Sequence, residues 1–559
     1  MMMLMLALPA FAMDSALIET AVSKEIERAM TGLAFPGQPK PHHITSHLLT
    51  GDMAEVWATD GALVFNNTRV LRSLRTEVRV GTPQLDSGNF DVAIGQSNGT
   101  YHWGLGHEDS DISIRKGLWI SMDKAYKGAT EAYAAKVAAR RGRDLKYTED
   151  FSPAPIVQIP HQASTPVRRE QLKTHVLALT KHIAPMDQLE LNDVAGQSFA
   201  GAMLVQDSAG TRTWLPQQEV VIRAQLLASA NDGTPLKNDR SWVAKNVESL
   251  PSQSEMNADL KAAADWMVTL QDAPTSDEYL GPVLFEPEAA AELFRQLLQP
   301  QICGTPPFES APDGANHDAR PVPSSRIGRR VLPSGWTVID QPQGDANLAS
   351  HMTHDFEGVV SRSVELVKEG VLRDVLMSRT PRADRSQSTG HARNMRGARF
   401  EAMPTQVTIR SARPKSWTKL RRLAISQAKT AGLPYVLVVK HLTPPALMDT
   451  LEFSITGDGP MAGLSSPTEV YRLYTDGREE PVRGLEFVGV DRRVLRDIVA
   501  SGRTSHPIEM LDVPGSSSRY ESGWFEGLPV SWSVPPVLID ELELHSRSGG
   551  EPRVISRPQ

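Results

Sequence analysis

Apolar residues recur at three- and four-residue spacing in four segments of the chain, and this period predicts amphipathic helices. The clearest helix is predicted from Asp111 to Lys136, ahead of the end signal Arg140-Arg141-Gly142. Its buried stripe is predicted to consist of Leu118, Met122, Ala125, Ala129, Tyr133 and Val137. Four charged side chains are predicted to point away from the core: Lys124, Lys127, Glu131 and Lys136. The other three helices are predicted over residues 15–29, 257–270 and 416–431, the last with Ser416 as its N-cap.

Alternating apolar and polar residues predict strands near the N-terminus. Three strand-like pieces centre on Ile44, Val56 and Val64. Turns between them are predicted at Gly51-Asp52 and at Asp60-Gly61, and an Asp-Gly pair is a strong hairpin signal. Arg75 to Gly81 alternates as a further strand. The first region is therefore predicted to be a helix that leads into an antiparallel sheet.

Two apolar runs in the second half of the chain predict another strand pair. They cover Val359–Val367 and Val371–Met377, and the chain is predicted to turn between them at Glu369-Gly370. Residues 148–167 and 231–256 are rich in Pro, Ser, Asn and charge, so both segments are predicted to be connections.

A chain of 559 residues is too long for one hydrophobic core and predicts two or three domains. We expect an N-terminal α/β domain over residues 14–110 and a middle domain with the long helix over 111–250. A large C-terminal domain is expected over 257–545, followed by a loose tail over 546–559.

Composition narrows the class of protein. Hydrophobic residues make up 40% and charged residues 22% of the chain, as in an ordinary soluble globular protein. The formal charge of -7 is thinly spread and no basic stripe is visible, so a nucleic-acid partner is not expected. The single cysteine, Cys303, excludes an internal disulfide. After the first residues no run approaches the roughly 20 apolar residues of a membrane-spanning helix.

Residues 1–12 are predicted to be a signal peptide. Met1 to Leu8 is apolar, and Ala10-Phe11-Ala12 fits the small-x-small pattern of a cleavage site. No basic residue precedes the apolar run, which indicates that the true start lies farther upstream. A plain apolar tail is the alternative. We expect an exported, periplasmic protein.

The segment from His354 to Arg393 places D-x-E-G, an apolar strand, E-G-V-L, a second strand and S-T-G-x-A-R in one order. This order resembles the C-terminal domain of the TldD/PmbA family, which is metallopeptidase-related. Asp111–Lys136 resembles the long helix of a secreted branch of that family, and Val470–Phe487 resembles its late hairpin. The resemblance spans roughly Asp14 to Leu544. It implies an α+β, multi-domain fold with twisted antiparallel and mixed sheets and a large C-terminal domain.

Active members of that family carry H-E-x-x-x-H on a helix and a cysteine nearer the C-terminus, which together bind zinc. Residues 281–296 resemble the family's run into this motif, with Pro287 at the first helical position. The histidine positions, however, fall on Arg295 and Pro300, and the glutamate position falls on Gln296. None of these side chains can bind zinc or act as its base. The region 513–532, where the family has its cysteine, holds no thiol but only hydroxyls such as Ser516, Ser517 and Ser518. The resemblance therefore implies no metal and no cofactor.

Two histidine groups have ligand-like spacing elsewhere. One comprises His42, His43 and His47, for which packing or a surface position is the favoured interpretation. The other comprises His351 and His354 beside Asp355, at the mouth of the D-x-E-G turn. Cys303 begins a Pro/Gly-rich loop that extends to Pro323, and loops of that length are usually functional or disordered. Its thiol lacks the sequence context of a reactive cysteine.

Ser388, Thr389 and Gly390 are the candidate substrate-contacting residues, because peptide substrates of the family lie extended against a strand edge. Ser388 with His391 would suit a serine hydrolase, but no G-x-S-x-G elbow is present. Gly390 is expected to allow a tight backbone path.

The family contains a metal-bearing kind, TldD-like, and a metal-free kind, PmbA-like or TldE. The two form a heterodimer that encloses a chamber in which unfolded peptides are cut. Because the ligands are missing, this chain resembles the second kind. We expect a non-catalytic subunit that processes extended peptides with a metal-bearing TldD-like paralogue. Two alternatives remain open: a stand-alone envelope protein for peptide binding or assembly, and an active hydrolase with relocated metal ligands.

Overall fold

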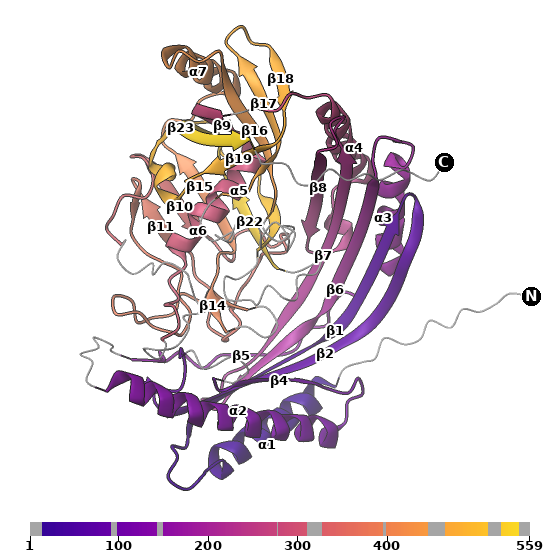
Figure 1. Cartoon of the computed structure of the whole chain (residues 1–559). Coiled ribbons are helices and arrows are strands. Elements are labelled where there is room, and N and C mark those ends of the chain that lie inside the picture. The colour runs from indigo at the N-terminus through magenta and orange to yellow at the C-terminus, as the bar shows by residue number, and fades with distance from the viewer. Residues whose placement is uncertain are drawn as a thin grey trace, which may run out of the picture.

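The computed structural model describes residues 14–90, 98–141, 149–276, 278–309, 327–394, 399–444, 464–512 and 527–546. A long, strongly curved sheet with helices on its outer side forms one part of the molecule, and a second part built from residues after 276 lies in its concave side (Figure 1). This mixed α+β architecture with antiparallel and mixed sheets confirms the predicted fold class.

The curved sheet has eight strands in the order β3-β2-β1-β6-β7-β5, with β4 beside β2 and β8 beside β7. The four longest strands are β1 (Pro41–Thr59), β2 (Ala62–Thr82), β6 (Leu191–Asp207) and β7 (Arg212–Ser229). The shorter ones are β3 (Leu85–Asp86), β4 (Thr100–Gly104), β5 (Gln158–Ile159) and β8 (Pro235–Ala244). Because β1 pairs with β6, segments 14–110 and 111–250 share this one sheet.

The turns predicted around β1 have different outcomes. Asp60 and Gly61 both have positive φ and close the β1–β2 hairpin, which confirms the prediction there. The turn predicted at Gly51-Asp52 is wrong, because β1 continues through it. Gly51 faces Gly201 of β6, and a Cβ on Gly51 would lie 2.6 Å from the Gly201 Cα. The glycine thus marks a close approach of two strands instead of a chain reversal.

Four helices cover one face of this sheet: α1 (Ser15–Gly32), α2 (Asp111–Arg140), α3 (Arg169–Ile183) and α4 (Gln253–Gln271). The face that they cover carries the even-numbered residues of β1, such as Ile44, Leu48 and Val56. The long helix is confirmed, with one error in its polar face. Lys136 is fully buried. Its ammonium donates to the Asp150 carboxylate at 2.8 Å, and this ion pair compensates for the loss of water.

The C-terminal part contains two larger sheets with α5 and most of the apolar core between them. The six-stranded sheet consists of β10 (Trp336–Asp340), β11 (Val364–Lys368), β12 (Val371–Leu372), β15 (Gln406–Ser411), β21 (Ile508–Asp512) and β22 (Leu528–Ser533). The seven-stranded sheet consists of β9 (Glu278–Phe285), β16 (Tyr435–Leu442), β17 (Pro467–Tyr474), β18 (Glu479–Val482), β19 (Leu485–Val488), β20 (Ile498–Ser501) and β23 (Val537–Ser546). A two-stranded piece joins β13 (Ala392–Arg393) to β14 (Glu401–Ala402).

Among the described residues of this part, the helices are α5 (Pro287–Leu297), α6 (Gln299–Ile302) and α7 (Trp417–Thr430). Helix α7 confirms its prediction, since the Ser416 side chain accepts the Lys419 backbone N–H as an N-cap. Single 3-10 turns occur at Val247–Ser249 and Arg492–Arg496.

Two strand predictions in the second half need correction. The turn at Glu369-Gly370 is confirmed by positive φ at both residues, but β11 begins only at Val364 and β12 has two residues. Residues 231–256 are also not a plain connection, because they contain β8 and the start of α4. The polar composition of β8 is misleading, since Asn238 and Arg240 are buried against Glu469 of β17.

Candidate functional site

Helix α5 places the residues that the resemblance aligns with the zinc motif. The helix begins with Pro287 at its first turn, where the missing N–H costs nothing. Its apolar stripe of Ala290, Leu293, Phe294 and Leu297 is buried, as predicted. Arg295 lies on the same helix but is also buried, with only 9% of its surface exposed. A buried guanidinium requires charged partners, and two are present.

Arg295 is held between two carboxylates. Its Nη2 donates to Glu292 Oε2 at 2.7 Å, and its Nη1 donates to Asp512 Oδ1 on β21 at 2.9 Å. Burial opposes the charge of Arg295, but the two carboxylates outweigh it and raise the pKa of Arg295 above its ordinary value. The ion cluster is therefore closed on itself.

Gln296 and Pro300 occupy the other two aligned positions. Gln296 Nε2 donates to Ser465 Oγ at 2.8 Å, and its Oε1 accepts the Ser465 backbone N–H at 2.9 Å. Pro300 lies within α6 and offers no donor or acceptor side chain. A zinc ion does not fit here, because the guanidinium at the aligned ligand position has no lone pair and is itself hydrogen-bonded to the two carboxylates within reach.

Within the described ranges, no group of three or more His, Cys, Asp or Glu side chains could hold a metal ion. Residues 513–526, which include Ser516, Ser517 and Ser518 in the region aligned with the family's cysteine, lie outside the described residues.

A cavity of about 820 Å³ lies between the concave face of the curved sheet and the C-terminal part. Its floor is made of residues that alternate with those buried under the helices, as the period-2 geometry of strands requires. From β1 and β2 these are His47, Leu49, Met53, Glu55, Arg69, Leu71, Ser73 and Arg75. The opposite wall comes from residues 348–354, Phe356, Arg393, Asn394 and 527–529. A volume of this size is typical of a ligand site.

The floor is arranged in cross-strand rows that end at Arg75. Arg75 faces His47, the next row pairs Ser73 with Leu49, and the row after that contains Gly51 opposite Gly201. Neither glycine has a side chain, and the Phe199 ring of the cavity lining occupies the space beside Gly51, where a Cβ would lie 2.8 Å from the ring. From His47 to Glu55 the floor runs roughly 26 Å at ~3.3 Å per residue.

Side-chain amides and apolar groups are interspersed along the cavity. The amides are Gln162, Gln197, Gln217, Gln218 and Asn394. The apolar side chains include Leu49, Met53, Leu71, Phe199, Met203 and Leu215. Amides both donate and accept hydrogen bonds, so they suit main-chain groups of a ligand without regard to its sequence.

Arg75 is the charged group at one end of this floor. It is 6% exposed, its Nη2 donates to Glu77 Oε2 at 3.1 Å, and its guanidinium lies 4.2 Å from the centre of the Phe400 ring. Burial lowers the pKa of Arg75, against the attraction of Glu77. Burial and the Arg75 charge together lower the pKa of His47 to about 3 and that of His102 to about 4. Both imidazoles are therefore neutral near pH 7.

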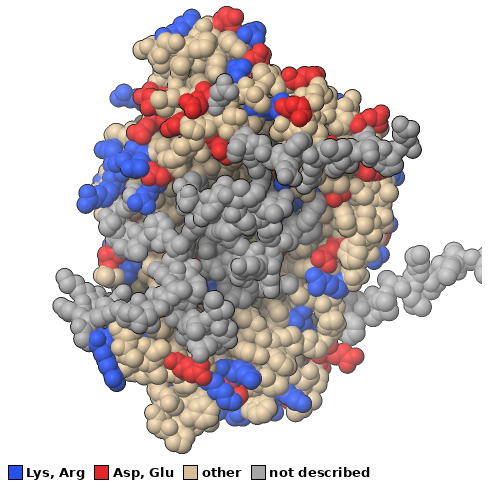
Figure 2. Space-filling model, viewed as in Figure 1, with Lys and Arg blue, Asp and Glu red and all other residues tan. Residues whose placement is uncertain are grey.

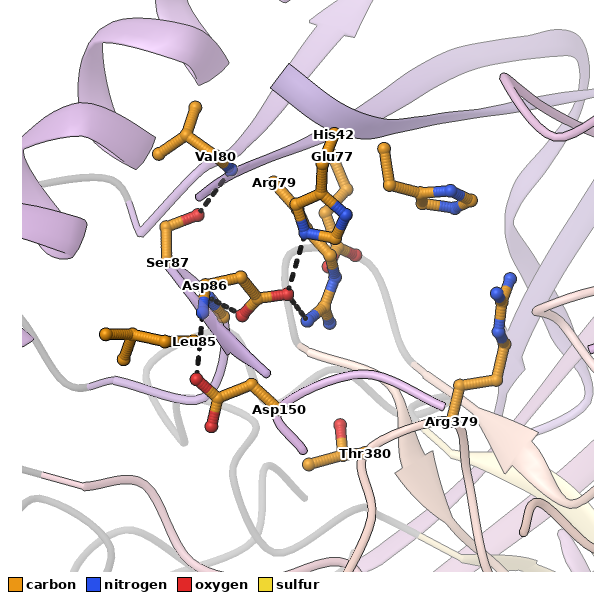
Figure 3. A network of polar contacts seen from close by, with 12 residues as sticks. His42, Glu77, Arg79, Val80, Leu85, Asp86, Ser87, Asp150, Arg379 and Thr380 are labelled. Carbon is orange, nitrogen blue, oxygen red and sulfur yellow. Dashed lines mark hydrogen bonds and ion pairs between the residues drawn. The ribbon is translucent and has the colours of Figure 1, made fainter. Parts of the chain in front are cut away.

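The ionic cluster behind Arg75 continues along β2. Arg79 donates to Glu77 Oε1 at 2.8 Å and to Asp86 Oδ2 at 3.0 Å. In Figure 3 the Asp86 carboxylate lies between His42 and Arg79, and Asp150 approaches the Asp86 backbone. Among the residues that the structure describes, Arg79 thus forms ion pairs with two carboxylates, whereas Arg75 forms an ion pair with one, which it shares with Arg79.

The histidines singled out in the sequence have separate roles. His42 lies 3.2 Å from Asp86, His43 contacts Thr45 Oγ1 at 2.9 Å, and His47 contacts the Phe356 carbonyl at 2.8 Å. His43 and His47 are buried, in agreement with the packing interpretation. His351 and His354 line the cavity wall, and the Asp355 carboxylate instead accepts the backbone N–H groups of its own turn and of Ala392.

The predicted substrate-contacting residues lie away from the cavity lining. Ser388 Oγ accepts the Gly390 N–H at 3.1 Å, and Thr389 Oγ1 accepts the Met377 N–H at 2.7 Å. Gly390 has φ +72° and packs against the Val360 carbonyl, as a tight backbone path requires. His391 contacts Thr389, and no contact between His391 and Ser388 is seen among the described residues. The substrate role of Ser388, Thr389 and Gly390 stays a prediction.

Arg75, Glu77 and Arg79 form an ionic cluster beside the cavity that the sequence analysis did not predict. The sequence does show a strand in which these charged residues alternate with the apolar Leu74, Val78 and Val80. Alternation of this kind normally indicates a solvated face. Here the C-terminal part covers that face, and only tertiary structure reveals the cover.

Comparison with known proteins supports the family. A family model described as the PmbA/TldA metallopeptidase C-terminal domain matches residues 276–546. No curated protein matched the chain. TldE from Thermococcus kodakarensis has a TM-score of 0.60 at 12% identity, with 95% of this chain and 100% of that chain covered.

Two further solved structures share the fold. A candidate modulator of a DNA gyrase from Thermotoga maritima has a TM-score of 0.60 at 13% identity, covering 94% of this chain and 99% of that one. A protein of the same description from Bacteroides thetaiotaomicron has a TM-score of 0.57 at 9% identity, covering 95% and 98%. At such low identity these structures show a shared fold, and the family model adds the sequence relationship. The chain is a member of the TldD/PmbA family.

Proposed function

We propose that this chain is a metal-free subunit of a heterodimeric peptidase, in which a metal-bearing TldD-like paralogue cuts peptides that this chain helps to hold. The observation that carries the proposal is Arg295 in its ion cluster with Glu292 and Asp512. A permanent cation at the position aligned with a zinc ligand opposes binding of a second cation. Catalytic metal would then have to come from a partner.

The cavity supports a role in holding peptide. Its length, its side-chain amides and its mixture of apolar groups suit an extended chain of variable sequence. An unfolded segment of about eight residues spans roughly 26 Å at ~3.3 Å per residue, the same length as the floor from His47 to Glu55. A folded domain would be too wide for such a space.

An exposed apolar end of the β1–β2 hairpin supports a protein partner. Four large side chains there are 38–48% exposed: Trp57, Leu63, Val64 and Phe65. Trp57 and Phe65 face each other across the hairpin. Grouped apolar surface of this kind is typical of interaction sites. On the face shown in Figure 2, by contrast, basic and acidic side chains are interspersed, which fits a partner other than nucleic acid.

Co-purification from the native host tests the proposal. We expect a tagged chain to retain a paralogue that carries H-E-x-x-x-H, with zinc in the assembly and none in this chain alone. Peptide cleavage should require both chains and be lost on chelation. Phe65→Asp should weaken the association, whereas Ile112→Asp, on the 72% exposed Ile112 of α2, serves as the matched control.

The two alternatives predict different results. A chain that binds peptide but retains no paralogue would favour a stand-alone envelope protein. Stoichiometric zinc in this chain alone, together with chelator-sensitive cleavage, would favour an active hydrolase with relocated ligands. Either result would overturn the proposed role as a metal-free subunit.

We also propose export to the periplasm, on the basis of the apolar residues 1–8 and the Ala10-Phe11-Ala12 site. Residues 1–13 lie outside the described residues. In the part of the chain that is described, no helix is long and apolar enough to cross a membrane. Cell fractionation of a C-terminally tagged chain should recover a mature form in the periplasm that has lost the first 12 residues.

A further inference from the structure

Arg75 has hydrogen-bonding capacity that the protein does not use. Its Nε and Nη1 are buried and have no hydrogen-bond partner among the described residues. These two atoms carry three of the five N–H donors of a guanidinium. Leaving donors of a buried charge unpaired is costly in a folded protein. An arginine in this state, at the end of a ligand-sized cavity, is suited to an anionic group.

The local charge balance also favours an anion. Glu77 is shared between Arg75 and Arg79, and Asp86 pairs with Arg79 and His42 but not with Arg75. His47 and His102 lie near Arg75 but are neutral near pH 7, because their pKa values are lowered. Among the described residues, Glu77 is therefore the carboxylate that forms an ion pair with Arg75, and it is shared; the Glu357 carboxylate also attracts Arg75 but forms no ion pair with it.

His47 adds an acceptor beside this donor. Its Nε2–H donates to the Phe356 carbonyl, so Nδ1 is left as an acceptor, and Nδ1 has no partner among the residues that the structure places. The last residue of a peptide offers both kinds of group, since its carboxylate accepts and its backbone N–H donates. A spherical inorganic anion offers no such donor.

We propose that Arg75 and His47 form a subsite for the free C-terminal carboxylate of a peptide lying in the cavity. This rests on the proposed function, in which the cavity holds peptide, and it adds the polarity of the bound chain. The peptide would end at Arg75 and extend along the floor toward Met53 and Glu55. Main-chain groups would meet the side-chain amides, so only the chain end would be recognised specifically.

Binding of matched peptides to the full-length chain tests this inference. The probe is an N-terminally fluorescein-labelled octapeptide of Ala, Ser, Gln and Leu, prepared as a free acid and as a C-terminal amide. Charge-assisted hydrogen bonds predict that the acid binds about 10- to 100-fold more tightly than the amide. Fluorescence anisotropy gives both affinities, on the chain alone and on the assembly from the native host.

Three variants identify the source of the preference. Arg75→Gln should lower acid binding to the level of the amide, and Arg75→Lys should retain part of the preference. Arg69→Gln is the matched control, because Arg69 lines the other end of the cavity and is already paired with Glu55 at 3.1 Å. It should leave the ratio of acid to amide unchanged.

Equal binding of acid and amide by the wild type would overturn the inference, as would a preference that survives Arg75→Gln.

An amidated octapeptide with glutamate at its last position distinguishes a carboxylate at the chain end from a carboxylate on a side chain. If it binds as tightly as the free acid, the subsite reads a side chain and the assignment to the chain end is wrong. If neither form binds, the peptide-holding role fails as well. A preference for the acid without any co-purified paralogue would sustain the subsite and overturn only the heterodimer.

Discussion

Arg295 and Arg75 are both buried arginines, yet their surroundings differ. Arg295 has two carboxylates to itself, Glu292 and Asp512, and its pKa is raised. Arg75 shares one carboxylate with Arg79, has two nitrogen atoms without partners among the described residues, and its pKa is lowered by burial. The guanidinium at the first position is paired with two carboxylates, whereas the one at the second keeps hydrogen-bond donors that no described residue accepts.

The difference separates a structural role from a binding role. A guanidinium that is paired with two carboxylates has little to offer a ligand, and removing one member of its cluster destabilises the fold. An incompletely paired one is maintained at a cost in stability, which makes Arg75 a candidate for a binding role because it also lines the cavity. Mutations at the two arginines should therefore change different measured quantities.

Removing the charge of Arg295 should have the largest effect. Arg295→Met leaves Glu292 and Asp512 buried without a cation, and a broken buried ion pair costs about 3–5 kcal/mol of unfolding free energy. Urea unfolding followed by circular dichroism measures this loss. Peptide affinity of the folded fraction should not change.

The triple variant Arg295→Met, Glu292→Gln and Asp512→Asn is the control, because it removes all three charges together. It should recover most of the lost stability. A loss below about 1 kcal/mol for Arg295→Met alone would mean that the cluster is not closed in the way described.

Glu509 extends the comparison to carboxylates of one strand. It lies on β21 with Asp512 but has backbone N–H donors, from Ala349 and Ser350, in place of an arginine. Burial raises the pKa of Glu509 from an ordinary 4.5 to about 7. Between these two pH values the folded chain holds a proton that the unfolded chain has released, so stability falls as pH rises.

The size of this fall is about 3 kcal/mol, since each unit of pKa shift corresponds to ~1.4 kcal/mol. Glu509→Gln keeps an acceptor for both N–H groups and removes the titration. The variant should gain stability relative to the wild type as pH rises from 4.5 to 7, and the gain should be constant above pH 8. Unfolding free energies measured across pH 4–8 would contradict the prediction if the two curves stayed parallel.

Arg75→Gln should have the smallest effect on stability. Its loss removes one ion pair and the contact with Phe400, but Glu77 keeps Arg79 as a partner and buried unpaired donors disappear. We expect a net change within about 1 kcal/mol in either direction. Urea unfolding beside Arg295→Met tests this directly. A loss as large as that of Arg295→Met would show that Arg75 is a structural residue.

Local features of the fold could be predicted from sequence. The long helix from Asp111, the capped helix after Ser416 and the turn at Glu369-Gly370 all depend on neighbouring residues, and each is present. Features that depend on contacts between residues far apart in the sequence could not be predicted. β8 looked like a polar connection because the partner of its Asn238 and Arg240 is Glu469, more than two hundred positions along the chain.

In the candidate site, too, some features could be predicted from the sequence and others could not. The absence of ligands at Arg295, Gln296 and Pro300 is visible in the sequence, but the two carboxylates that hold Arg295 are not both local, since Asp512 comes from β21. The cavity could not be predicted at all. Its floor depends on the register that sets Arg75 opposite His47 and Gly51 opposite Gly201, and its wall depends on how the C-terminal part packs against the sheet.

The pairing of β1 with β6 has a consequence for how the chain acquires its structure. Thr59 pairs with Asp193, so one edge of the first hairpin stays open until more than a hundred further residues have been synthesised. Contacts this distant in sequence slow folding, and an open strand edge is prone to aggregation in the meantime. Fragments that end before Leu191 should therefore be poorly soluble, and the newly made chain is a natural client for a chaperone.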